Sequence, residues 1–516
     1  MDNRYEQPDF STILKLYEKY CPQNTVELQN FYDAPHGQFL EFGPAIKLNI
    51  PHDVCCDLIA DTNWGELPLN EDDHHRKLSH EVAHYFQLLG TSYGYLLYRA
   101  RRARHINFYH LFRRKAELYP DEKLQRPCKN FFMKTLGAGG ADSLFSTLAY
   151  DYFYWDLMIS FLHDYKGRDS EYYTHSMVGL CTKILGEDVH NTNTIMDESV
   201  LGDCLALTDK AMRRWMVSLS KDDSIYPNFT LSPRAIIEGY ARVVEHISLR
   251  NKNVELLLSD QQQFKKMSQT VYGDASNYLW EELGNIIHQR QLYPFMMLIF
   301  IAIFELSLMV RLHPALMKGI YLKNFKIEEF FVLDRFFSIV NVVKKELLDK
   351  ERLVVSQLIE VSFDNSKFPI LLDYICAQLG WLSYSKSLEE LSIYYDRASE
   401  NIKHKDARYF YDVTKKIINI KREYKGLPLL DSRDLLAFDV DLIILCPDGK
   451  HLMGKPSSDS DLLDEILSAL VVDMNNLEIM EVDNFKVTEE YRRYIYPPIV
   501  SVSFLLSQHP FERHFS

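Results

Sequence analysis

The chain has 516 residues, more than one ordinary hydrophobic core can hold, so we expect several domains or subdomains. Its apolar and charged fractions of 47% and 25% are typical of globular proteins, which argues against a disordered or fibrous chain. The formal net charge of −14 argues against a general nucleic-acid binder, because such proteins are normally basic.

Residues 1–65 are predicted to form a mixed α/β region. A short helix is expected at about 10–19, and "GPAIKLNIP" (43–51) alternates apolar and polar side chains as a half-buried strand does. The first ten residues lack the apolar stretch of a signal peptide, and the eight cysteines form no CxxC pair. We therefore expect reduced cysteines and a cytoplasmic location.

Residues 66–350 show mainly helical periodicity, and sparse glycine agrees with a mainly α (α+β) fold. The basic segment 99–115 is interpreted as a solvated helix, with an acidic ligand as the alternative. The glycine-rich "GAGGAD" (137–142) lacks the rest of a nucleotide-binding fingerprint and is predicted to be a loop.

The longest apolar run, 292–310, contains Glu305 and is uninterrupted for fewer residues than the roughly 20 that a membrane span needs. A carboxylate facing lipid also costs about 2.5–3.5 kcal/mol on insertion scales. The run is therefore predicted to be a buried core helix, with Pro294 in its first turn, and no membrane span is expected.

Residues 351–516 are predicted to be helical first and then α/β. The segment 387–424 has the pattern of two amphipathic helices. After it, 438–450 indicates a strand and turn, and 458–474 a capped helix.

The segment "KLSHEVAHYFQLLG" (77–90) carries an HExxH motif, made of His80, Glu81 and His84. A helix is predicted over Glu71–Leu89, with Asn70 as its cap and Gly90 as its stop. Two histidines four residues apart leave the same helix face, where both imidazoles can take corners of a zinc tetrahedron.

The residues around the motif are uncharged, as in the extended zincin signature, which this segment resembles except for Lys77. The metzincin pattern fails, because Gln87 stands where its glycine belongs and Gly90 where its third histidine belongs. The gluzincin pattern, in which a later helix supplies a glutamate, remains.

The segment 232–250 suits that second helix, since Ser232 can cap it and Pro233 can occupy its first position. Glu238, Arg242 and Glu245 share one of its faces. Glu238, in "EGYAR", resembles the ligand-bearing glutamate of gluzincins, and Glu245 is the alternative.

The resemblance implies a zincin-like helical metallopeptidase core in which His80, His84 and Glu238 bind Zn²⁺. It makes Glu81 the general base that activates a zinc-bound water against a peptide bond of a protein or peptide substrate. Arg242 would orient a carboxylate, while Tyr240 and His246 are candidates for supporting the oxyanion.

Two alternatives remain from the sequence. The chain could be a catalytically silent, zincin-like interaction or regulatory protein that binds a protein partner through its terminal regions. It could also be a ferritin-like di-iron protein, because ExxH occurs at Glu81–His84 and again at Glu187–His190. The second ExxH lies among residues typical of a loop, which disfavours that alternative.

Overall fold

In the computed structural model, the described residues are mainly helical and include one small sheet. The described residues are 37–40, 45–60, 69–98, 100, 159, 231–248, 274–289, 296–311, 329, 332–349, 368–400, 405–422, 443–445 and 451–453. The segments predicted at 10–19, 137–142 and 458–474, and 99–115 apart from Ala100, lie outside them.

The sheet joins strands from both ends of the chain. Its order is β1 (Gly37–Leu40), β2 (Ala45–Leu48), β3 (Ile443–Leu445) and β4 (His451–Met453). The outer pairs are antiparallel, whereas β2 and β3 run parallel. Both central strands fall where the apolar pattern predicted them. Ile46 and Leu48 of β2 and Ile444 of β3 are buried, and α3 packs against β1 and β2.

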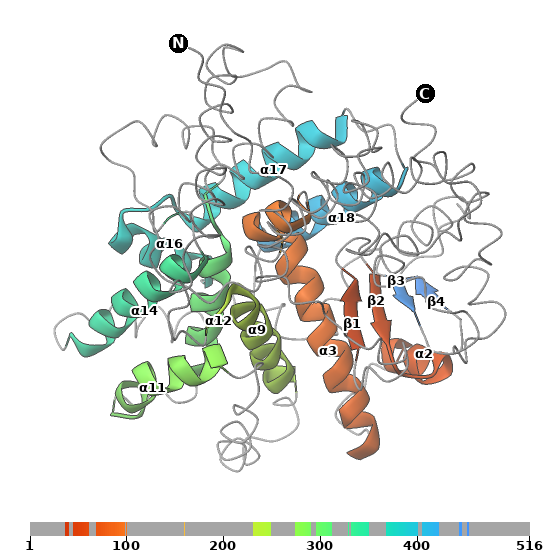
Figure 1. Cartoon of the computed structure of the whole chain (residues 1–516), viewed down its shortest axis with the longest axis horizontal. Coiled ribbons are helices and arrows are strands. Elements are labelled where there is room, and N and C mark those ends of the chain that lie inside the picture. Colours follow the sequence, from red (N-terminus) through yellow and green to blue (C-terminus); the bar gives the residue numbers. More distant parts are fainter. Residues whose placement is uncertain are drawn as a thin grey trace, which may run out of the picture.

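Helix α3 (Leu69–Leu89) lies between this sheet and the helical part of the fold (Figure 1). It contacts β1 and β2 on one side and α9 (Pro233–Ser248) on the other. Helix α9 packs in turn on α11 (Asp274–Gln289) and α12 (Met296–Leu308), and α14 (Val332–Leu348) packs on both of those. A short helix, α2 (His52–Ala60), contacts β4 at the far side of the sheet.

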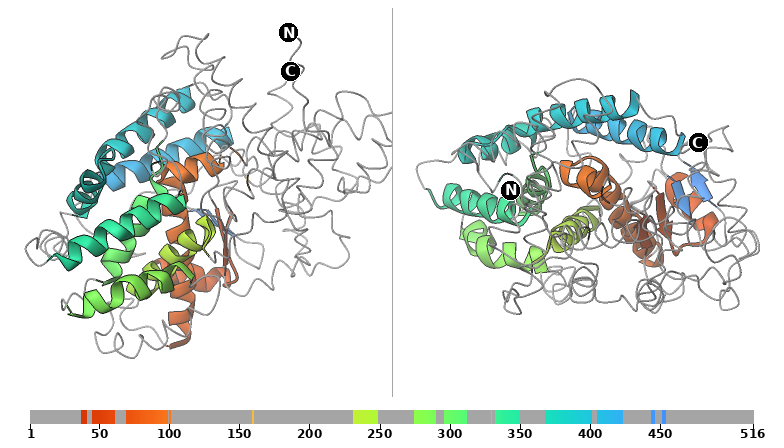
Figure 2. Two further views of the ribbon diagram at one scale, coloured as in Figure 1. Left: turned by 60° about the vertical axis from the view of Figure 1, so that its left-hand side comes forward. Right: turned by 45° about the horizontal axis from the view of Figure 1, so that its top comes forward.

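Helices α16 (Phe368–Leu379), α17 (Tyr384–Glu400) and α18 (Lys405–Arg422) complete the helical part. The two amphipathic helices predicted from the sequence are α17 and α18, which pack against each other (Figure 2). Helix α18 also contacts α3. The segment that follows α3 packs on α17 and α18 through edge-to-face ring contacts. Tyr95 contacts Tyr395 of α17, and Tyr98 contacts Tyr411 of α18.

The start of α3 differs slightly from the prediction. The helix begins at Leu69, so Asn70 lies inside its first turn and cannot be its cap, since a capping residue precedes the helical backbone. Its end at Leu89 is as predicted. Cysteines 55, 56 and 376, the ones within the described residues, are free thiols.

The described part of the apolar run is confirmed as a core helix, since every side chain of α12 is buried. Pro294, predicted in the first turn, lies outside the described residues. Glu305 is compensated inside the protein: Lys421 Nζ of α18 donates to its Oε1 at 2.7 Å, and the Tyr384 hydroxyl donates to the same oxygen at 2.9 Å. Lys421 also donates to the carbonyl oxygen of Gly90, at the end of α3, at 3.1 Å. No helix in the described part of the chain is both long and apolar enough to cross a membrane.

Position 90 has little room for a side chain. A Cβ atom there would lie 2.7 Å from both Lys421 Cε and the backbone oxygen of Phe86, closer than real Cβ contacts. The residue that ends the helix therefore also makes room for the buried ammonium group.

Replacing Lys421 with methionine should lower the free energy of unfolding by about 3–5 kcal/mol, because Glu305 would stay buried without its cation. The matched control is Lys415→Met on the same helix. Its ion pair with Asp396 is about half exposed, so we expect a loss of less than about 1 kcal/mol. Urea titration of both variants measures the difference, and adding Glu305→Leu to Lys421→Met should restore part of the stability. Equal midpoints for the two lysine variants would contradict this account of α12.

Candidate metal centre

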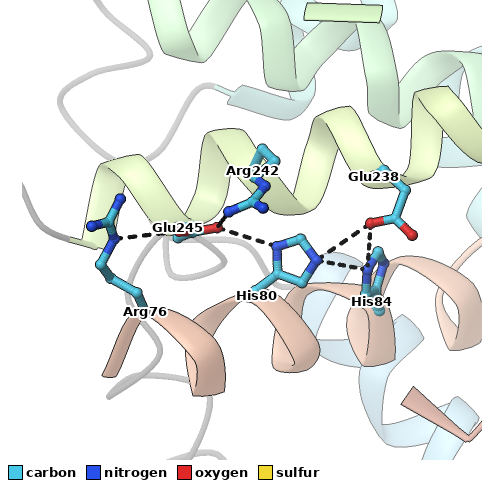
Figure 3. Close-up of polar contacts among 6 residues, drawn as sticks. All are labelled: Arg76, His80, His84, Glu238, Arg242 and Glu245. Carbon is cyan, nitrogen blue, oxygen red and sulfur yellow. Dashed lines mark hydrogen bonds and ion pairs between the residues drawn. The ribbon is translucent and has the colours of Figure 1, made fainter. Parts of the chain in front are cut away.

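The site forms where α3 and α9 pack side by side in opposite directions. Arg76 of α3 pairs with Glu245 of α9, and two turns further along α3 His84 pairs with Glu238. Since the residue numbers rise along one helix as they fall along the other, the pairing is antiparallel. Figure 3 shows both rows of side chains facing each other.

Helix α9 begins as the sequence predicted. The Ser232 hydroxyl accepts a hydrogen bond from the backbone N–H of Ala235 at 3.2 Å, which is N-cap geometry. Gly239, next to Glu238, faces away from α3. A Cβ there would lie 3.0 Å from Phe304 of α12, so the absence of a side chain at Gly239 allows α9 and α12 to pack closely.

Three donor atoms meet between the two helices. His80 Nε2 and His84 Nε2 lie 3.1 Å apart, and each lies 3.3 Å from Glu238 Oε2. A tetrahedral zinc with bonds of about 2.0–2.1 Å separates its ligand atoms by roughly 3.3–3.4 Å. The three atoms therefore already have the spacing of three corners of such a site.

These donors are suited to a cation and poorly satisfied without one. Glu238 Oε2 is buried and makes no hydrogen bond, because its contacts with the two imidazoles are within ion-pair distance but badly aligned for hydrogen bonding. Two ring nitrogens of different histidines facing each other at 3.1 Å need a proton or a metal between them. The group His80, His84 and Glu238 fits a single metal ion.

The surrounding carboxylates favour positive charge at this point. Burial lowers the pKa of His80, but its contacts with Glu238 and Glu245 and the nearby charge of Glu81 outweigh burial and raise it to about 10. Burial alone would raise the pKa of Glu238, yet the charge of His84 and the contact with His80 hold it well below its usual range. The same negative potential that holds a proton here attracts a divalent cation.

Glu245 contacts the other nitrogen of His80 and is itself held by two arginines. Its Oε2 lies 3.3 Å from His80 Nδ1 and accepts a hydrogen bond from Arg242 Nη1 at 2.7 Å. Its Oε1 lies 3.3 Å from Arg76 Nε. The predicted association of Arg242 with a carboxylate is present, and the carboxylate is Glu245.

Arg76 is the residue of this site that the sequence analysis missed. Its spacing of four residues before His80 places it on the same face of α3, and that spacing was the available signal. Without knowing that Glu245 lies opposite, nothing distinguished Arg76 from the other charged residues that begin this helix.

The other predicted site residues are Glu81, Tyr240 and His246. Glu81 is 5% exposed, next to His80 on α3. Tyr240 lies on the opposite face of α9 from Glu238, where burial and then the Glu305 carboxylate raise its pKa well above the ordinary value. His246 is part of α9, but its side chain lies outside the described residues, as do Glu187 and His190.

Comparison of the chain with protein-family models, with curated proteins and with solved structures found no match.

Protein loaded with Zn²⁺ and then desalted should retain about one ion per chain, since three donors form one site. His80→Ala and His84→Ala should each remove most of that metal. The matched control is His288→Ala, on the exposed end of α11, which should retain it. Metal analysis measures the ratio; two irons per chain, or equal retention by all three variants, would contradict a site at His80, His84 and Glu238.

Proposed function

We propose that this chain is a zinc-dependent metallopeptidase with a gluzincin-like arrangement of ligands. The observation that carries the proposal is the meeting of His80, His84 and Glu238 from two antiparallel helices, at the spacing that a tetrahedral ion requires. The sequence places Glu81 directly after the first of these donors. This combination of two imidazoles, one carboxylate and an adjacent buried carboxylate suits hydrolysis of peptide bonds.

Zinc bound by these residues would supply a Lewis acid that polarises a substrate carbonyl and acidifies a water molecule. The chain's own part is proton transfer and orientation. Glu81 accepts the proton of the attacking water and returns it to the nitrogen of the leaving amine as the C–N bond breaks. His80 and His84 hold their Nε2 atoms toward the centre, and Glu238 contributes the negative charge.

A second candidate is a protein that keeps this centre for stability or regulation and performs no hydrolysis. Its support is the low exposure of the donors, since the side chains of His84 and Glu238 are only 9% and 13% exposed. Structural zinc sites are closed to substrate, whereas catalytic sites leave one position open. The sheet that joins both ends of the chain would then be a candidate surface for a protein partner. A cytoplasmic location and a peptide or protein substrate stay predictions from the sequence.

The variant Glu81→Gln should separate the two candidates, because it keeps the size of the side chain and removes its basicity. We expect it to retain about one zinc per chain and to lose about 10²–10⁴-fold in peptide hydrolysis, the usual contribution of a general base. Cleavage of a mixed peptide library, followed by mass spectrometry, measures the rate.

The matched control is Glu281→Gln, an exposed carboxylate on α11, which should hydrolyse peptides as the wild type does. A wild type that holds zinc but cleaves no peptide, or a Glu81→Gln variant with full activity, would favour the regulatory candidate.

A further inference from the structure

Two glutamates of α9 compete for the role of carboxylate ligand. Glu238 and Glu245 are seven residues apart on one face of the helix, and each has an oxygen 3.3 Å from a nitrogen of His80. They approach different nitrogens: Glu238 lies at Nε2, on the side of His84, and Glu245 lies at Nδ1. Either side chain could reach a metal beside His80, because a glutamate side chain has three rotatable bonds. Distance alone therefore does not show which glutamate is the ligand.

The two carboxylates differ in what holds them. Both oxygens of Glu245 face a guanidinium group, Oε1 that of Arg76 and Oε2 that of Arg242. The Oε2 atom of Glu238 makes no hydrogen bond. The Arg242 contact is a hydrogen bond, whereas Arg76 Nε makes none and pairs with Glu245 through charge. Glu245 would therefore have to leave two cations to reach a metal, whereas Glu238 gives up no hydrogen bond at Oε2.

The cost of that movement falls on buried charges. Glu245 is 5% exposed, and the arginine side chains that hold it are about three-quarters buried. Removing one partner of such a pair leaves the other charge poorly solvated, which is strongly unfavourable. The arginines come from different helices, Arg76 from α3 and Arg242 from α9, so Glu245 is fixed relative to both.

A carboxylate held at Nδ1 influences whether Nε2 of the same ring is available to bind a metal. A neutral imidazole carries one hydrogen. Glu245 Oε2 lies 3.3 Å from Nδ1, within ion-pair distance but not aligned for a hydrogen bond, and its negative charge favours the hydrogen on Nδ1 over Nε2. The Nε2 lone pair is then free for a metal, and the carboxylate also makes the imidazole a better ligand.

We propose that Arg76 and Arg242 form an arginine clamp that reserves Glu245 for His80 Nδ1, and that this clamp assigns the role of metal ligand to Glu238. Glu245 is thus a positioning residue: it acts on the metal through His80. This inference rests on the proposed metal site, but not on hydrolysis by that site.

The first experiment measures zinc affinity by competition with a chromophoric chelator. Glu245→Gln keeps an acceptor oxygen and loses the charge, so it should still bind one zinc per chain, about 10–100-fold more weakly than the wild type. The matched control is Arg234→Gln, an exposed arginine on the same helix, which should bind zinc as the wild type does. Equal affinities for Glu245→Gln and the control would overturn the inference and leave the metal site standing. A wild type that binds no zinc would overturn the proposed function and this inference with it.

The second experiment tests whether the clamp assigns the ligand. In the wild-type background, Glu238→Gln should lose most of its zinc affinity. In the double variant Arg76→Gln/Arg242→Gln, Glu245 is released and can replace Glu238, so the same Glu238→Gln change should cost at least ten-fold less affinity. The absorption spectrum of bound Co²⁺ should also differ between the wild type and the double variant, because their carboxylate ligands differ. Equal losses in both backgrounds, with unchanged spectra, would show that the clamp has no such role.

A measurement on the unaltered protein removes the dependence on folding of the variants. The measurement is NMR of zinc-loaded wild type labelled with ¹⁵N-histidine. The His80 ring should carry its hydrogen on Nδ1 and bind the metal through Nε2. A His80 ring that binds zinc through Nδ1 would overturn the inference, because Glu245 could not then be its hydrogen-bond acceptor.

Discussion

The site depends on the antiparallel contact between α3 and α9. Each helix alone carries charged residues at intervals of three or four positions, which is common and has no chemical consequence by itself. Antiparallel packing places Arg76 against Glu245 and His84 against Glu238, with His80 between the two glutamates. A shift by one turn, about 5.4 Å, would place His80 beside other residues of α9 and separate the donors. Contacts from other described helices oppose such a shift.

Several contacts restrain the two helices from outside the site. Helix α9 is held close to α12 because Gly239 leaves room for Phe304. The end of α3 is held by Lys421, which reaches Gly90 from α18 and also neutralises Glu305 on α12. A buried ion pair contributes little net stability, but it tolerates few alternative arrangements, since any movement leaves a charge without a partner. Helix α18, whose Lys421 lies 331 residues beyond Gly90, therefore helps to set the position of α3.

The sequence predicted the helices of the site and the candidate donors, but it missed β1 and α2 and could not predict the contacts between elements. The HExxH spacing predicted the common face of His80 and His84, and the Ser232–Pro233 start predicted α9. The buried character of the 292–310 run followed from Glu305 and from its length. The partner of Glu305 could not be predicted, because Lys421 lies in an ordinary amphipathic pattern and its burial depends on tertiary packing. For the same reason Glu245 remained an alternative ligand: its restraint by Arg76 comes from another helix. The parallel pairing of β2 with β3 was equally hidden, since the two strands are far apart in sequence.

The pKa of His80 explains how such a site can stay assembled before a metal arrives. A histidine whose pKa is about 10 in the folded chain, above its ordinary 6.5, contributes stability that is fully present below pH 6.5 and is lost as pH rises through 10. Near neutral pH a proton therefore holds His80 between Glu238 and Glu245 in the metal-free protein. A metal that binds there must displace that proton, so binding strengthens as pH rises toward 10. Three carboxylates, Glu81, Glu238 and Glu245, act on the two imidazoles, so in the proposed metal site a proton and a metal would compete for the same place. Arg76 and Arg242 both pair with Glu245 and so offset part of this negative charge.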